Sequence, residues 1–140
     1  MPSISSDNAF QPSSSVWVQP DYLAEMDADG ECDLLNEVIT LFIAEGERRI
    51  ESLRNAASVN DFETLAWQGH AFRGSALQLN ATSLARLSED IEQTAVARRP
   101  DDYLAVVKRL ETVFHQVCEA MAAYRNSVAS RVRHSASELP

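Results

Sequence analysis

The sequence of 140 residues contains little proline and glycine and no long apolar run. Its five prolines are Pro2, Pro12, Pro20, Pro100 and Pro140. None of them lies within residues 21–99. Because proline removes a backbone hydrogen bond and clashes with the preceding helical turn, its absence from this stretch permits long helices. A membrane-spanning helix needs about 18 or more consecutive apolar residues, and the sequence contains no such run, so we expect no contact with a membrane.

Basic residues are also scarce. Twelve Lys and Arg stand against 21 Asp and Glu, which gives a formal net charge of −9 at pH 7. A protein that binds nucleic acid needs clustered cations to neutralise the phosphates. The composition therefore argues against DNA or RNA as the main partner.

Cysteine is represented only by Cys32 and Cys118, which lie too far apart for the paired spacing of a metal site. Two free thiols in a reducing compartment are the simplest interpretation. Residues 1–15 lack the basic start and the apolar stretch of a secretory signal peptide. We therefore expect a cytoplasmic protein without a bound metal.

Hydrophobic periodicity divides the chain into three parts. Residues 1–15 are serine-rich and aperiodic, so we expect a flexible N-terminal segment. Residues 16–127 form the expected domain, in which apolar residues recur at steps of three and four, as in amphipathic helices. Residues 128–140 are expected to be a flexible C-terminal tail.

The domain contains one short and four long periodic segments. We expect a short helix after Pro20, with inward-facing side chains at Tyr22, Leu23 and Met26. The predicted N-caps of the last three helices are Asp61, then Thr82 or Ser83, then Asp101. Asn80 is the predicted left-handed C-cap between the third and fourth helices. The short connections predict an all-α fold: an antiparallel four-helix bundle core with an additional short N-terminal helix.

His70 is the candidate reactive residue. The apolar stripe of its helix comprises Phe62, Leu65, Phe72, Ala76 and Leu79. At about 100° per residue, His70 lies roughly opposite this stripe and faces solvent. The same face carries Trp67, Arg73, Gly74 and Leu77. An imidazole is largely neutral at pH 7 and offers a nucleophilic nitrogen, so this position suits covalent chemistry.

Two neighbours of His70 fit a site that handles phosphate. Arg73 lies one helical turn further on, where its guanidinium can meet phosphate oxygens. Gly74 costs the helix roughly 0.5–1 kcal/mol relative to alanine, but it leaves the imidazole open to an approaching partner. Gly69 carries the same cost, but it points toward the core, where close helix packing explains it.

The stretch HAFRGSALQLNA, residues 70–81, resembles the histidine-containing phosphotransfer family. Members of that family have a histidine, a basic residue at +3, Gly at +4 and usually Ser at +5. Upstream, VQPDYLAEMDADGECDLLNEVITLF resembles the family's opening helices, and LARLSEDIEQTA downstream resembles its fourth helix, so the resemblance covers about residues 16–124. Two positions depart from the pattern: Arg73 stands where lysine is commoner, and Asn80 where glycine is usual.

The resemblance implies a phosphocarrier. His70 would accept a phosphoryl group from a receiver-domain aspartyl phosphate or a histidine kinase and pass it to a response regulator. Arg73 would contact the phosphate, and Gly74 would give the partner access. The expected docking residues around the ring are Ala66, Trp67 and Leu77.

The partners expected from the resemblance are response-regulator receiver domains and a hybrid sensor histidine kinase. Mg²⁺ is expected on the receiver, with no cofactor on this chain. We expect the carrier to be a monomer. Because no Gly-rich nucleotide loop is present, we also expect it to lack autokinase activity.

Three alternatives stay open, one of which is the substrate module of a chemotaxis-type kinase, acting here as a separate protein. A non-phosphorylated helical adaptor could bind a receiver or a kinase with the same bundle, although the presence of both His70 and Arg73 argues against it. A helical metal protein could use Glu111, His115 and Glu119, which share a helix face at spacing four. No second copy of this motif exists, so surface ion pairs are the simpler interpretation.

Overall fold

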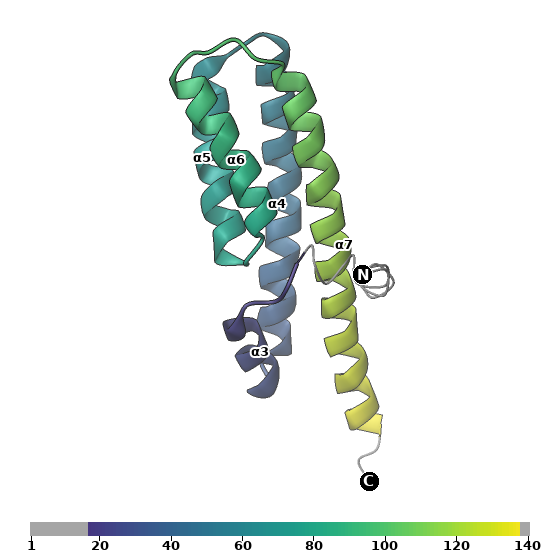
Figure 1. Cartoon of the computed structure of the whole chain (residues 1–140). Helices are drawn as coiled ribbons and strands as arrows, with labels where there is room; N and C mark the ends of the chain where they lie inside the picture. The colour runs from purple at the N-terminus through teal and green to yellow at the C-terminus, as the bar shows by residue number, and fades with distance from the viewer. Residues whose placement is uncertain (1–16, 138–140) are drawn as a thin grey trace, which may run out of the picture.

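The structure is a computed structural model that describes residues 17–137, with side chains described as far as residue 131. This part of the chain contains five α-helices and no strand. The helices are α3 (Asp21–Ala28), α4 (Cys32–Ser58), α5 (Phe62–Gln78), α6 (Thr82–Val96) and α7 (Tyr103–Ser137). The two long helices α4 and α7 run side by side, the α5–α6 hairpin lies along one half of them, and α3 lies beside the start of α4 (Figure 1). The predicted all-α bundle with a short N-terminal helix is confirmed.

Left-handed residues make the short connections between these helices. Asn60 and Asn80 have φ values of 55° and 63°, and asparagine tolerates this conformation better than most residues. After Asn80, the Ala81 N–H donates to the carbonyl of Ala76 at 2.8 Å, which closes the C-terminus of α5. The predicted role of Asn80 is confirmed.

The predicted N-caps were correct only in part. The carboxylate of Asp61 accepts a hydrogen bond from the Thr64 N–H at 3.2 Å, so this cap is confirmed. The start of α6 has no side-chain cap, so the predicted cap at Thr82 or Ser83 was wrong. At α7, it is Asp102 rather than Asp101 whose carboxylate accepts from a first-turn N–H, that of Ala105, at 3.1 Å.

The apolar stripes of the four long helices meet in one core, at whose centre Phe72 and Phe114 pack edge to face with centroids 5.7 Å apart. A Cβ atom at Gly46 would collide with the Phe114 ring, so this glycine lets α4 and α7 approach. In α3, Leu23 is fully buried as predicted. Tyr22 is instead exposed, because its hydroxyl reaches outward to donate to the carbonyl of Gln78 at 2.9 Å.

The segment before α3 holds the end of α5 in place. Trp17 is buried, its ring packs edge-on against Tyr124 at 5.8 Å, and its Nε1–H donates to the carbonyl of Leu79 at 2.6 Å. One side chain therefore links the start of the domain to α7 and to the C-terminus of α5.

Helix α7 runs past the expected domain boundary at residue 127. Helix α7 continues to Ser137, and Val128 is buried. Arg131 donates to the carboxylate of Asp27 at 2.8 Å, so this part of α7 also contacts α3. The expected flexible segment 1–15 and residues 138–140 lie outside the described residues. None of the helices described is both long enough and apolar enough to cross a membrane.

Candidate functional site

His70 lies at the middle of α5, on the face that the bundle leaves open. Its side chain is 65% exposed, as the helical phase predicts. The neighbouring Phe72 points the opposite way into the core, where it is fully buried. The core therefore fixes the rotation of α5 and holds the imidazole outward.

Glu92 of α6 contacts the imidazole. Its Oε2 atom lies 3.0 Å from Nδ1 of His70. An ionised carboxylate can only accept a hydrogen bond, so Nδ1 carries the proton when this bond forms. The neutral ring then has its free electron pair on Nε2. The contact thus distinguishes the two ring nitrogens, which the sequence could not do.

Arg73 leans from α5 toward α6. Its Nη1 atom lies 3.7 Å from Oε2 of Glu89, and its Nε atom lies 3.9 Å from Oε1 of Glu92. The side chain is 32% exposed. The guanidinium is thus close to His70, as its spacing predicts, but it already has carboxylate neighbours.

Sequence reasoning missed both Glu89 and Glu92. Glu92 follows His70 by 22 residues and belongs to a different helix. The close approach of the two helices is visible at Gly69, where a Cβ atom would lie 2.8 Å from the Ser88 carbonyl oxygen. The predicted packing role of Gly69 is therefore confirmed, and it was the one sequence signal that a neighbouring helix comes near His70.

Gly74 faces open space. Apart from its two chain neighbours and the nearby backbone of α5, no atom lies within 4 Å of the position that its Cβ would occupy. On the same exposed face, Trp67 and Leu77 are 65% and 53% exposed. Ala66 differs from them, because it is partly buried against the core. The face that carries His70 thus has an unfilled position at Gly74 and two exposed apolar side chains, Trp67 and Leu77.

The competing candidates do not form a second chemical centre. Glu111 accepts a hydrogen bond from Arg54 at 2.8 Å, so this carboxylate forms an ion pair, as the simpler interpretation of the motif expects. Among the described residues, no three His, Cys, Asp or Glu side chains are grouped as a metal site. Burial raises the pKa of the Cys118 thiol to about 12, so it stays protonated at neutral pH and is a poor nucleophile.

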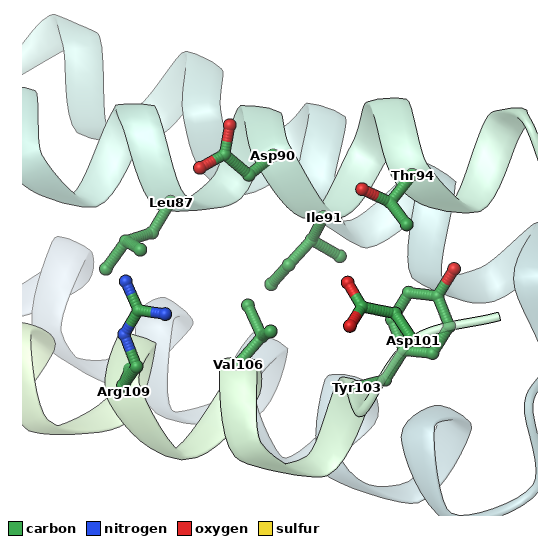
Figure 2. Close-up of a pocket in the computed structure, with 8 residues that line it drawn as sticks. All are labelled: Leu87, Asp90, Ile91, Thr94, Asp101, Tyr103, Val106 and Arg109. Carbon is green, nitrogen blue, oxygen red and sulfur yellow. The ribbon is translucent and has the colours of Figure 1, made fainter. Parts of the chain in front are cut away.

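A cleft of about 260 Å³ lies between α6 and α7 (Figure 2). Its α6 side is lined by Leu87, Asp90, Ile91 and Thr94. The Arg109 side chain extends from α7 toward Leu87. These α6 positions point away from Glu92 and the imidazole, and the cleft contains no histidine or cysteine. The candidate site is therefore the α5–α6 face.

An exposed histidine, oriented by a carboxylate on the outside of a helical bundle, is the arrangement of a phosphocarrier. The family model described as Hpt domain matches residues 37–127, which is more than half of the chain. The chain belongs to the Hpt domain family, whose function is phosphotransfer in phosphorelay signalling.

Two known proteins are similar to this chain, one in sequence and one in structure. Multistep phosphorelay regulator 1 of Schizosaccharomyces pombe is 28% identical over 81 residues, which are 58% of this chain and 28% of that protein. The chain thus matches less than a third of that relative's length. The crystal structure of histidine-containing phosphotransfer protein B from Pseudomonas aeruginosa has a TM-score of 0.70 and 24% identity, and the match covers 78% of this chain and 95% of that one. This second likeness supports the fold.

Proposed function

We propose that this chain accepts a phosphoryl group on Nε2 of His70 and passes it to a response regulator. The observation that supports this most directly is the exposed imidazole, whose Nδ1 lies 3.0 Å from Glu92. With Nδ1 engaged by Glu92, the electron pair on Nε2 of this exposed ring is the one available to a partner.

The chemistry needs positioning more than covalent help from the protein. When the donor is an aspartyl phosphate, the electron pair on Nε2 forms the P–N bond as the P–O bond to the aspartate breaks. The ring then carries a positive charge, and the Glu92 carboxylate stabilises it through the Nδ1–H bond. In the forward transfer, the P–N bond breaks, its electron pair returns to Nε2, and a P–O bond forms on the next receiver.

The neighbours of His70 assist this exchange in different ways. The Arg73 guanidinium is one turn away and supplies donors for the phosphate oxygens. Gly74 leaves the space beside the ring open. Trp67 and Leu77 offer exposed apolar surface for docking, with a smaller contribution from the partly buried Ala66.

The partners follow from this chemistry. We expect receiver domains on both sides of the transfer, with a hybrid sensor histidine kinase upstream, and a monomeric carrier in the cytoplasm. Mg²⁺ is expected to come with the receiver, because no carboxylate cluster surrounds His70 within its own helix. We also expect the carrier to lack autokinase activity.

The test is incubation with a phosphorylated receiver domain and Mg²⁺, followed by mass measurement on the intact protein. The wild type should gain one phosphoryl group, and His70→Gln should gain none while melting at nearly the same temperature, because the side chain is exposed. His115→Gln, an exposed histidine on α7, is the matched control and should label as the wild type does. ATP alone should label none of the three.

Labelling of His70→Gln would show that the site is wrong. A wild-type protein that binds the receiver and gains no phosphoryl group would favour the alternative of a non-phosphorylated adaptor. In the labelled protein, NMR should identify the phosphorylated nitrogen as Nε2.

A further inference from the structure

Glu89 stands beside the phosphate-handling residues without touching the imidazole. Its Oε2 atom lies 3.7 Å from Nη1 of Arg73. The same oxygen accepts a hydrogen bond at 3.3 Å from the side-chain amide of Gln93, one turn further along α6. Glu89 is therefore held from one side by Gln93 and presents its charge to Arg73.

The two α6 carboxylates, those of Glu89 and Glu92, have different closest contacts. Glu92 makes a 3.0 Å bond to His70 and lies 3.9 Å from Arg73, so its closest contact is the imidazole. Glu89 has the shorter distance to the guanidinium. Before any phosphoryl group arrives, Arg73 thus faces α6, with Glu89 as its nearest carboxylate.

A phosphoryl group on Nε2 creates a competition for this guanidinium. Phosphate adds about two negative charges and three strong acceptor oxygens at neutral pH. Arg73 has one planar set of donors, and turning it toward the phosphate weakens its attraction to Glu89. The attraction that Arg73 loses to Glu89 reduces the net free energy that it gains by contacting the phosphate.

We propose that Glu89 is a positioning residue that competes with the phosphoryl group for Arg73 and so shortens the residence of that group on His70. The consequence is a carrier that donates readily instead of storing the phosphoryl group. Loss to a receiver breaks the P–Nε2 bond and forms a P–O bond to the receiver's aspartate. Loss to water breaks the same bond and forms inorganic phosphate. This inference rests on the proposed function of His70.

The test compares two variants in which an exposed or partly exposed glutamate is replaced by glutamine, which removes its charge. Glu89→Gln removes the charge with little change in shape, and its side chain is 42% exposed, so the bundle should fold. Glu119→Gln removes the same charge from an exposed position on α7 and is the matched control. Both are mixed with a phosphorylated receiver, and the ratio of phosphorylated carrier to phosphorylated receiver is measured at equilibrium. Melting curves verify that each variant is folded.

Exposed ion pairs are weak, so Glu89→Gln should shift this ratio toward phosphorylated His70 by roughly two- to fivefold. The lifetime of the phosphohistidine after removal of the receiver should increase in the same direction. Glu119→Gln should match the wild type in both measurements. Because the effect is transmitted by Arg73, Glu89→Gln should change neither quantity when it is introduced into Arg73→Gln.

Three results separate the failure of this inference from failure of the proposed function. A wild-type protein that gains no phosphoryl group overturns the proposed function, and this inference with it. A labelled Glu89→Gln protein with the wild-type ratio and lifetime overturns this inference alone. An equal shift in the Arg73 and Arg73→Gln backgrounds shows that Glu89 acts by direct repulsion and removes the competition for Arg73.

Discussion

Substitution of Gly74 tests whether this glycine provides access or packing. Apart from its two chain neighbours and the nearby backbone of α5, no atom lies within 4 Å of its Cβ position, so Gly74→Ala adds a methyl group that meets no other part of the bundle. The remaining effect is helix propensity, which favours alanine by roughly 0.5–1 kcal/mol. For a domain of this size, we expect the melting temperature to rise by about 1–4 °C.

Gly69 in the same helix is the matched control. There a Cβ atom would lie 2.8 Å from the Ser88 carbonyl oxygen and 3.1 Å from the Glu92 backbone nitrogen. Backbone atoms cannot move aside alone, so α5 and α6 must separate. Overpacking of this kind typically costs 1–3 kcal/mol, and Gly69→Ala should melt below the wild type.

The functional part of the test uses a longer side chain. Gly74→Gln should fold, but its side chain would fill the open space at position 74, one helical turn from His70, and obstruct a docked receiver. We expect the initial transfer rate from a phosphorylated receiver to fall roughly tenfold or more, which corresponds to about 1.4 kcal/mol. The rate with phosphoramidate, a small donor that needs no protein surface, should change little.

The two rates and the melting curve are measured on the same Gly74→Gln preparation. A Gly74→Gln protein that melts well below the wild type would show that the glycine is needed for packing. A stable variant that receives the phosphoryl group from the receiver at the wild-type rate would refute the access role.

Two further predictions concern the support of α5. Trp17→Phe leaves the Leu79 carbonyl without its indole donor, so we expect a loss of about 1–3 kcal/mol in the free energy of unfolding, measured by chemical denaturation, with phosphotransfer to His70 retained. At Asp61, the hydrogen bonds from the Thr64 side chain and backbone lower the pKa below its ordinary value of 3.8. The folded state therefore favours the ionised carboxylate, and this stabilisation is present above the unfolded pKa and lost as the pH falls through the folded one. Asp61→Ala should melt below the wild type at pH 7, and the gap should narrow as the pH falls below about 4; a gap independent of pH would contradict the assigned cap.

The helices could be predicted from the sequence because their signals are local. Steps of three and four between apolar residues and the absence of proline from residues 21–99 specify long amphipathic helices. Asn80 could be assigned for the same reason, since its left-handed conformation depends on its own backbone. The cap of α6 could not, because α6 begins at Thr82 and its N-cap position is Ala81, whose side chain has no hydrogen-bond acceptor. The hydroxyls of Thr82 and Ser83 lie within the helix, one or two residues too late to cap it.

The end of α7 depends on tertiary contacts. The last part of the sequence has few apolar residues, which is typical of a tail. Val128 is nevertheless buried, and Arg131 reaches Asp27 of α3 at 2.8 Å. A contact over 104 residues of sequence gives no local signal, so periodicity alone did not predict that α7 continues past residue 127.

In the candidate site too, the residues placed by local helix geometry could be predicted, and those placed by tertiary packing could not. His70, Arg73 and Gly74 belong to one helix, whose geometry fixes their relative positions once the helix is predicted. Glu89 and Glu92 belong to another, and their positions depend on how far α6 is shifted and rotated against α5. A shift of one residue in that pairing would turn the carboxylate by about 100° and break the bond to Nδ1. Gly69 allows the close approach, but a glycine does not specify which residue it faces. The sequence therefore indicates the imidazole of His70 as the proposed acceptor, and only the packing of α5 against α6 indicates Nε2 as the nitrogen that we propose to be phosphorylated.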